Sequence, residues 1–263
     1  FAKVCHAAPV TPPPDRSSLR LSLSAGPFSG HLTGTEQRAK DGWLRELPLQ
    51  GVTILAVEDS RFACEALRLI ARRAGARLRR AETMAAARDH LRVYRPDVVL
   101  VDLGLPDGRG DTLIRDLVRG PRRPAVVMGT SGTPEGRGLA LAAGADGFLD
   151  KPLENMAQLC RVLRPLLPEL DIHPPPIVGG QNLMPDPLAL RDDLAFAADA
   201  LKGEPGPERQ RYVSAFLAGI AAHANDPTLA EAARLSGEGP GLDRLRHLLA
   251  ARLRPASPVA GAR

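Results

Sequence analysis

The sequence reads Asp97-Val98-Val99-Leu100-Val101-Asp102 near its middle, with four aliphatic residues in a row between two aspartates. A strand this apolar is buried on both faces, and in a parallel sheet that requires helices on both sides. Residues 103–108 follow as a loop that contains two glycines and a proline. The stretch therefore predicts a central strand of an α/β fold, with a carboxylate at its carboxyl end.

The same alternation of elements extends in both directions from this strand. Three more short apolar runs indicate strands at 52–57, 125–128 and 147–150, and a weaker, more polar stretch indicates one at 77–81. Apolar residues at helical spacing predict helices at 62–74, 82–94, 111–119 and 154–167, with a weaker, glycine-rich one before residue 143. Because short βα units cross over right-handed, we expect an α/β fold with a doubly wound, five-stranded parallel sheet.

Composition divides the chain of 263 residues into five segments. Residues 1–50 are rich in Pro, Ser and Gly without a hydrophobic period, which predicts a flexible tail. Residues 51–170 carry the α/β pattern, and the Pro- and Gly-rich residues 171–187 are expected to be a linker. Residues 188–254 predict a small all-helical domain, with helices at 188–202, 208–224, 227–236 and 241–253, and residues 255–263 a flexible end.

Charge, aromatic content and cysteine spacing argue against several classes of function. The net charge is +5, but the arginines are scattered, and only 3% of the residues are aromatic, so no stacking platform for single-stranded nucleic acid is visible. Cys5, Cys64 and Cys160 do not have metal-site spacing. No apolar stretch is long enough to span a bilayer, and no signal peptide is recognised, so a cytoplasmic location without membrane contact is expected.

Polar residues stand at the carboxyl ends of the predicted strands, where open α/β sheets bind ligands. They are Glu58 and Asp59, then Asp102, then Thr130 with its neighbours, and then Lys151. Three carboxylates held together repel one another unless a cation lies among them, and their oxygens suit Mg²⁺. A lysine and a hydroxyl beside them predict a site that accepts a phosphoryl group on a carboxylate.

Each of these features alone has an ordinary structural explanation. A single Asp after a strand is more often a turn or capping residue, and the acidic pair could cap the next helix. The Lys151-Pro152 pair alone would indicate a turn. The ordered set at the ends of four strands is what favours a chemical site.

The motifs that carry these residues resemble one known family. Residues 51–168, a little under half of the chain, look like the chemotaxis-type receiver domain of two-component response regulators, which has a flavodoxin-like fold. The resemblance rests on Val57-Glu58-Asp59-Ser60, Val99-Leu100-Val101-Asp102-Leu103-Gly104-Leu105-Pro106-Asp107-Gly108, Ala143-Gly144-Ala145-Asp146-Gly147-Phe148 and Lys151-Pro152.

The resemblance implies a role for each matching residue. Asp102 corresponds to the phosphoacceptor, and Lys151 to the lysine that pairs with the phosphoryl oxygens, followed by a bond to proline that is usually cis. Metal ligands correspond to Glu58, Asp59, Asp102 and the backbone carbonyl of Gly104, with Asp59 the more direct of the acidic pair. Phe148 corresponds to the aromatic switch residue. Any enzymatic activity would be limited to Mg²⁺-dependent self-phosphorylation and slow self-dephosphorylation at Asp102.

One position departs from the family pattern. The family places Thr or Ser at the end of the fourth strand, whereas counting back without gaps from Lys151 puts Gly129 there. We favour Thr130 as the catalytic and switch hydroxyl, because the chemistry needs a hydroxyl, and keep Ser131 as an alternative.

Two other interpretations of the α/β region are disfavoured. A degenerate receiver would not accept phosphate, but all of its acidic and lysine positions are filled here. A haloacid-dehalogenase-like phosphatase would place a second Asp two residues after the nucleophile, where this chain has Gly104.

The output of the helical region has three candidate classes. Residues 186–254 contain ten acidic and nine basic side chains, so a DNA-binding face is not expected. His223 and His247 lack the surroundings of a phosphotransfer histidine, and the region is short for such a bundle. We favour a protein-interaction domain, with DNA-binding transcriptional output as the alternative. The expected partners are a histidine kinase or phosphotransfer protein and, through the receiver, a second copy of the chain.

Overall fold

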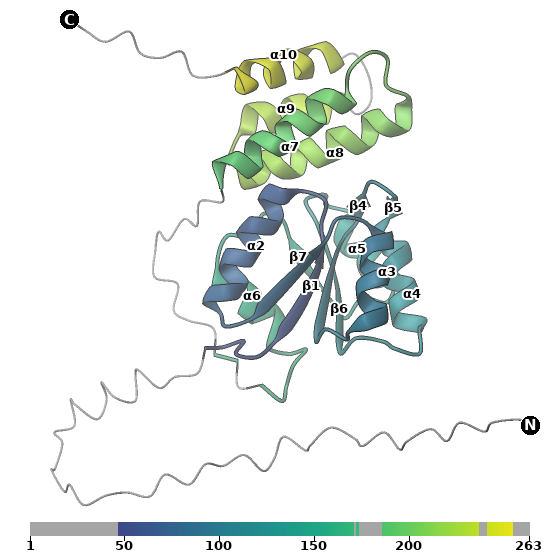
Figure 1. Ribbon diagram of the computed structural model, residues 1–263, viewed down its shortest axis with the longest axis vertical. Helices are drawn as coiled ribbons and strands as arrows, with labels where there is room; N and C mark the ends of the chain where they lie inside the picture. Colours follow the sequence, from purple (N-terminus) through teal and green to yellow (C-terminus); the bar gives the residue numbers. More distant parts are fainter. Residues whose placement is uncertain (1–46, 171, 174–185, 237–240, 255–263) are drawn as a thin grey trace, which may run out of the picture. The chain divides into compact units, whose positions relative to one another are not determined.

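The computed structural model describes residues 47–170, 172–173, 186–236 and 241–254 (Figure 1). Nearly all of the predicted tail, most of the predicted linker and the predicted C-terminal end at 255–263 lie outside the described residues. No helix in the described ranges is both long enough and apolar enough to cross a bilayer.

A five-stranded parallel sheet forms the centre of the first region (Figure 1). Its strands are β1 (Thr53–Val57), β2 (Arg77–Ala81), β3 (Val98–Asp102), β6 (Val126–Ser131) and β7 (Gly147–Asp150), in the order β2-β1-β3-β6-β7. The predicted doubly wound sheet with its flavodoxin-like strand order is therefore confirmed. In this order the chain changes direction across the sheet between β1 and β3, and ligands of such sheets bind at this point.

Helices cover both faces of the sheet, as the apolar strands require. They are α2 (Arg61–Arg73), α3 (Met84–Val93), α4 (Gly110–Arg119), α5 (Gly136–Ala142) and α6 (Met156–Leu163). One apolar core joins the sheet to α2 and α6, and a second joins it to α3, α4 and α5 (Figure 1). Alternate residues of each strand enter alternate cores, so Leu100 and Met128 face α2 and α6, whereas Val101 and Val127 face the other side.

Three side-chain caps set where helices of this region begin. Ser60, Thr83 and Asn155 each accept a hydrogen bond from the backbone amide three residues later, and so start α2, α3 and α6. The helix predicted from residue 82 begins at Met84 instead, because Thr83 has extended backbone geometry and caps it.

A two-stranded ribbon occupies the segment predicted to be a loop after β3. Its strands are β4 (Gly104–Leu105) and β5 (Gly108–Arg109), paired antiparallel. The chain then returns to β3 so closely that a Cβ on Gly110 would lie 1.9 Å from the carbonyl oxygen of Asp102. Only glycine fits there, so Gly110 fixes the path of the loop beside Asp102.

The second region is helical, as predicted, and consists in the described residues of α7 (Pro187–Ala200), α8 (Pro207–His223), α9 (Pro227–Ser236) and α10 (Leu242–Leu253). Three of the helices begin at a proline, Pro187, Pro207 or Pro227, where proline is tolerated because its missing N–H would be unpaired anyway. Their core includes Leu201, Leu217 and Leu229, and it also takes in Phe62 from α2. The helical region therefore shares side-chain packing with the sheet region.

The core of the sheet region extends slightly beyond the predicted bounds of 51–170. Leu49 and Ile172 are both buried in the core that contains α2 and α6. Leu49 lies there because its backbone N–H donates to the carbonyl of Ala74 at the end of α2, 2.7 Å away.

Candidate functional site

Three acidic side chains meet at the carboxyl ends of β1 and β3. Glu58 and Asp59 follow β1 directly, and Asp102 is the last residue of β3. One carboxylate oxygen from each lies within 4.8 Å of the others. The hydrophobic strands thus bring together two acidic segments more than 40 residues apart, as the sequence predicted.

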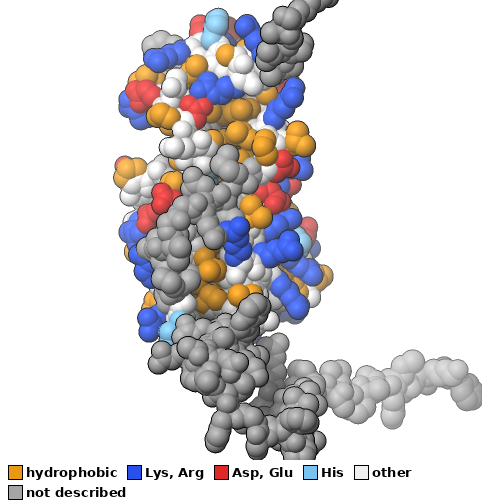
Figure 2. All heavy atoms as spheres, turned by 90° about the vertical axis from the view of Figure 1, so that its left-hand side faces the viewer, with side chains coloured by type: hydrophobic (Ala, Val, Ile, Leu, Met, Phe, Trp, Pro, Cys, Tyr) orange, Lys and Arg blue, Asp and Glu red, His pale blue; other side chains and the backbone are white. Residues whose placement is uncertain are grey.

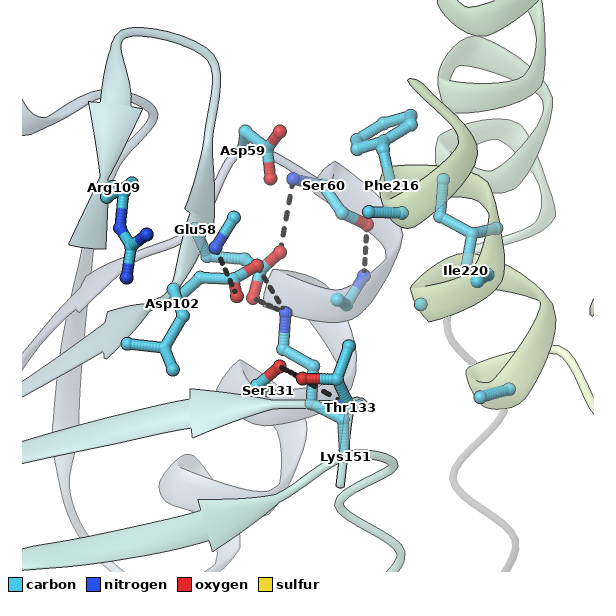
Figure 3. Close-up of a pocket in the computed structure, with 18 of the residues that line it drawn as sticks. Glu58, Asp59, Ser60, Asp102, Arg109, Ser131, Thr133, Lys151, Phe216 and Ile220 are labelled. Carbon is cyan, nitrogen blue, oxygen red and sulfur yellow. Dashed lines mark hydrogen bonds and ion pairs between the residues drawn. The ribbon is translucent and has the colours of Figure 1, made fainter. Parts of the chain in front are cut away.

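Lys151 joins this group from the end of β7. Its Nζ lies 2.6 Å from Glu58 Oε2 and 2.6 Å from Asp102 Oδ2, and its side chain is only 10% exposed (Figure 3). The peptide bond from Lys151 to Pro152 is cis. A buried ammonium group between two buried carboxylates is held by charge-assisted hydrogen bonds, which are stronger than neutral ones.

The site carries more negative than positive charge, and the pKa values reflect this. Burial raises the pKa of Glu58 to about 8, with Asp102 and Asp59 adding to the effect and Lys151 opposing it. Burial likewise raises the pKa of Asp59 to about 6. Burial alone would lower the pKa of Lys151, but the carboxylates of Asp102 and Glu58 raise it above its usual value.

These side chains fit a hard divalent cation. Carboxylate oxygens are the ligands that Mg²⁺ prefers, and a cation among them would offset the charge that Lys151 leaves unbalanced. The backbone of Gly104 lines the same cavity, and its N–H donates to Asp102 Oδ1 at 3.2 Å. Asp102 therefore has one oxygen held by Gly104 and the other by Lys151.

The side chain of Arg80, near the end of β2, also holds the acidic pair by donating to its backbone carbonyls. Its Nε donates to the carbonyl of Glu58 at 2.9 Å, and a second guanidinium nitrogen contacts the carbonyl of Asp59. Sequence reasoning did not single out Arg80, because a positive charge on a polar strand gives no sign of its partner.

Arg109 on β5 also lines the cavity, where it pairs with Asp111 at 3.0 Å.

The hydroxyl residues at the end of β6 and just after it are placed differently from the expectation. Thr130 is directly opposite Asp102 in the β3–β6 register and is buried, but it is not among the residues that line the cavity. Ser131 and Thr133 do line it, and their hydroxyls are 3.2 Å apart (Figure 3). The choice of Thr130 stays a prediction, with Ser131 the alternative that reaches the cavity wall.

Phe148 lies on the opposite face of the sheet from Leu149 and is buried in the core with α5. Gly129 is its neighbour across the β6–β7 pairing. A Cβ on Gly129 would come within 2.4 Å of the Ala140 Cβ and 3.3 Å of the Phe148 ring. The position that the ungapped count assigns to the switch hydroxyl thus has no room for a side chain in this conformation.

Side chains from the helical region reach the same site, and sequence reasoning missed them. The Tyr212 hydroxyl on α8 donates to Asp59 Oδ2 at 2.5 Å. Asp193 on α7 is buried and accepts from Ser60 Oγ and from the backbone N–H of Phe62, at 2.8 and 3.0 Å. No motif could reveal these contacts, because 153 and 133 residues separate Tyr212 from Asp59 and Asp193 from Ser60.

The two histidines that were set aside have different surroundings. His223 is half-buried at the end of α8, and its Nδ1 lies 3.0 Å from the carbonyl of Gly219. Burial, together with the charge of Lys151, lowers its pKa to about 4. His247 is exposed on α10.

Comparison with known proteins agrees with this geometry. The model of the response regulator receiver domain family matches residues 54–164. Over 114 residues the chain is 36% identical to the KDP operon transcriptional regulatory protein KdpE of Escherichia coli (strain K12). The matched region covers 42% of this chain and 51% of KdpE. The chain thus spans about half the length of this relative.

Solved structures of receiver domains are also similar to part of the chain. A CheY-like receiver domain from Methylobacillus flagellatus is 26% identical and covers 44% of this chain and 98% of its own, with a TM-score of 0.40. The receiver domain of the sensor histidine kinase PA1611 from Pseudomonas aeruginosa, solved with a magnesium ion coordinated in its active site cleft, is 24% identical. It covers 45% of this chain and 98% of its own, with a TM-score of 0.41.

The strand order and the acid–lysine cluster at its switch point define a doubly wound α/β domain with a charged site. Residues 54–164 are more particularly a response regulator receiver domain of the two-component type. Its acidic group of Glu58, Asp59 and Asp102 is compatible with magnesium binding.

Proposed function

We propose that Asp102 accepts a phosphoryl group from a histidine kinase or phosphotransfer protein, and that the chain signals through protein–protein contacts. The observation that carries this proposal is the placement of Lys151 Nζ, 2.6 Å from both Asp102 Oδ2 and Glu58 Oε2. The ammonium group of Lys151, held beside the acceptor carboxylate, can neutralise charge on the oxygens of an incoming phosphoryl group. This arrangement prepares a carboxylate to act as a nucleophile toward phosphorus.

In the proposed transfer, an oxygen of Asp102 attacks the phosphorus of the donor. The bond from phosphorus to the donor's imidazole nitrogen breaks as the acyl-phosphate bond forms, and the imidazole leaves with the electron pair. Lys151 pairs with a phosphoryl oxygen, and a hydroxyl from Thr130 or Ser131 donates to another. Mg²⁺, held by Glu58, Asp59, Asp102 and the carbonyl of Gly104, would neutralise further charge on the phosphoryl oxygens.

Phosphorylation is proposed to act on the face that carries Phe148. Phe148 is buried against α5, and the Arg137 guanidinium lies 5.2 Å from the centre of its ring. A two-state shift of this face would change its contacts with a partner or with a second copy of the chain. In this proposal a cytoplasmic location follows from the kinase partner.

The alternative output is DNA-binding, and the name of KdpE favours it. That likeness, however, covers only half of KdpE. Basic side chains are spread over the face shown in Figure 2, with acidic ones among them. Since DNA affinity depends on a clustered basic surface, we favour the protein-interaction output. A gel shift with random duplex DNA at two salt concentrations separates the two outputs.

Beryllofluoride with Mg²⁺ tests the acceptor site. We expect it to shift the amide NMR signals of the wild-type receiver, and Asp102→Asn to abolish that response. Asp116→Asn is the matched control, because Asp116 is exposed on α4 and pairs only with Arg88 among the described side chains. An unchanged response in Asp102→Asn would exclude Asp102 as the acceptor.

A further inference from the structure

Helix α8 lies over the mouth of the acceptor site. A cavity of about 340 Å³ separates them, lined on one side by Glu58, Asp102 and Lys151. On the other side it is lined by Phe216, Ile220 and their neighbours on α8 (Figure 3). A small molecule could occupy this cavity, whereas a protein that must bring a phosphohistidine to Asp102 would meet α8 first.

Two polar anchors hold the helical region at this place. Tyr212 donates its hydroxyl proton to Asp59 Oδ2 at 2.5 Å. The carboxylate of Asp193 accepts hydrogen bonds from the first backbone amides of α2, those of Arg61 and Phe62, and from the Ser60 hydroxyl. Each anchor attaches to the segment that immediately follows β1, and so to the acidic pair or to its neighbours.

An apolar anchor supports the polar ones. Phe62, the second residue of α2, is 4% exposed and is buried in the helical core with Val213 and Leu217 instead of in either core of the sheet. A free receiver would expose this ring to water. Burying an aromatic side chain removes its apolar surface from water, which favours the docked arrangement.

We propose that α7 and α8 form a cover over the receiver site, and that Tyr212 and a divalent cation compete for Asp59. The cation part of this inference rests on the proposed function, because it takes Asp59 as a metal ligand. A hydroxyl proton and a cation draw on the same carboxylate lone pairs, so each weakens the binding of the other. The competition is partial, since Asp59 keeps a second oxygen.

Tyr212→Phe tests the competition because it removes one hydroxyl and leaves the ring in place. We expect Mg²⁺ to bind the full-length variant about tenfold more tightly than the wild type, measured by isothermal titration. Tyr94→Phe is the control, because the buried Tyr94 hydroxyl has no hydrogen-bond partner among the residues that the structure describes. Equal Mg²⁺ affinity in the wild type and in Tyr212→Phe would overturn the competition.

Amide hydrogen exchange without metal tests the cover by itself. Tyr212→Phe and Asp193→Ala are both expected to speed exchange at Arg61, at Phe62 and along α8, while the strands stay protected. Unchanged exchange in both variants would overturn the cover, whether or not Mg²⁺ binds. Failure of Mg²⁺ to bind any variant, with faster exchange, would instead count against the proposed metal site and against the competition, and would leave the cover standing.

Discussion

The two described regions bury their polar groups in different ways. The sheet region gathers four charged side chains at one edge, three carboxylates and Lys151, and leaves its two cores apolar. The helical region has a core of Leu, Val, Ala and Phe, and its buried polar residues are Asp193, Ser214 and Ser236. One region keeps a costly cluster of charge, and the other is built for packing.

The difference shows which region is shaped by chemistry. Uncompensated buried charge lowers stability, so a fold that keeps it needs the charge for another purpose. In the helical region, Asp193 is satisfied by three donors from the sheet region, and the Ser214 and Ser236 hydroxyls pair with each other at 2.8 Å. The polar groups of the helical region therefore serve docking and packing.

Removing the buried lysine gives the largest expected effect. Lys151→Ala leaves Glu58, Asp59 and Asp102 without their cation, and we expect it to lower the free energy of unfolding by about 4 kcal/mol in metal-free buffer. Urea denaturation measures the loss, and added Mg²⁺ should restore part of it.

An exposed ion pair in the helical region is the control for this experiment. Lys202 lies 2.6 Å from Asp199, the same distance as in the buried pairs, but its side chain is 78% exposed. Lys202→Ala should leave the urea midpoint unchanged, because solvent screens exposed pairs. Equal losses in the two variants would mean that the two regions do not differ in how they hold charge.

The next largest expected effect comes from substituting two residues of one helix that pack into different cores. Phe62 and Ile70 both lie on α2, but Phe62 packs into the helical core and Ile70 into the sheet core. Each substitution by Ala should cost about 3 kcal/mol, Phe62→Ala mainly in the helical region and Ile70→Ala mainly in the sheet.

The rate of thiol labelling at two buried cysteines measures how often the sheet core opens in these variants. Cys64 and Cys160 are buried there, and burial raises their pKa values to about 12 and about 11, so both should stay unreactive until the core opens. In a Cys5→Ser background, Ile70→Ala should speed labelling and Phe62→Ala should leave it slow. Equally fast labelling in both variants would show that the two regions unfold as one unit.

The regions also differ in how far the sequence predicted them. Four of the five strand positions followed from apolar runs. The placement of Glu58, Asp59, Asp102 and Lys151 followed from the polar residues at or just after the ends of three of these runs. The β4–β5 ribbon was missed, because two-residue strands show no periodicity. In the helical region the prolines marked the helix starts, but nothing local predicted which face would meet the receiver.

Contacts between regions are the part that sequence patterns could not supply. Tyr212 lies in an ordinary amphipathic helix, and its partner Asp59 is 153 residues away. Periodicity shows that a face is buried but not what covers it. The sequence did not fix the switch hydroxyl for a related reason. The position depends on the path of the chain at the end of β6, where Ser131 and Thr133 rather than Thr130 line the cavity.

The smallest expected effect is a change in how the free energy of unfolding depends on acidic pH. Burial and Lys151 hold the pKa of His223 at about 4, below the usual 6.5 of the unfolded chain. Between these two values the unfolded state binds more protons than the folded state, so this histidine makes stability fall as pH drops from about 6.5 towards 4. His223→Gln should reduce that loss in urea titrations at a series of pH values, and should change little above pH 7.

His247→Gln is the matched control, since His247 Nδ1 also lies near the carbonyl four residues earlier, at 3.1 Å, but the side chain is exposed. That variant should keep the acid sensitivity of the wild type. If His223→Gln lost stability with acid as steeply as His247→Gln, His223 would be neither buried as described nor close to the positive charge of Lys151. The end of α8 would then be farther from the acceptor site than the docked arrangement places it, and the two regions would act independently.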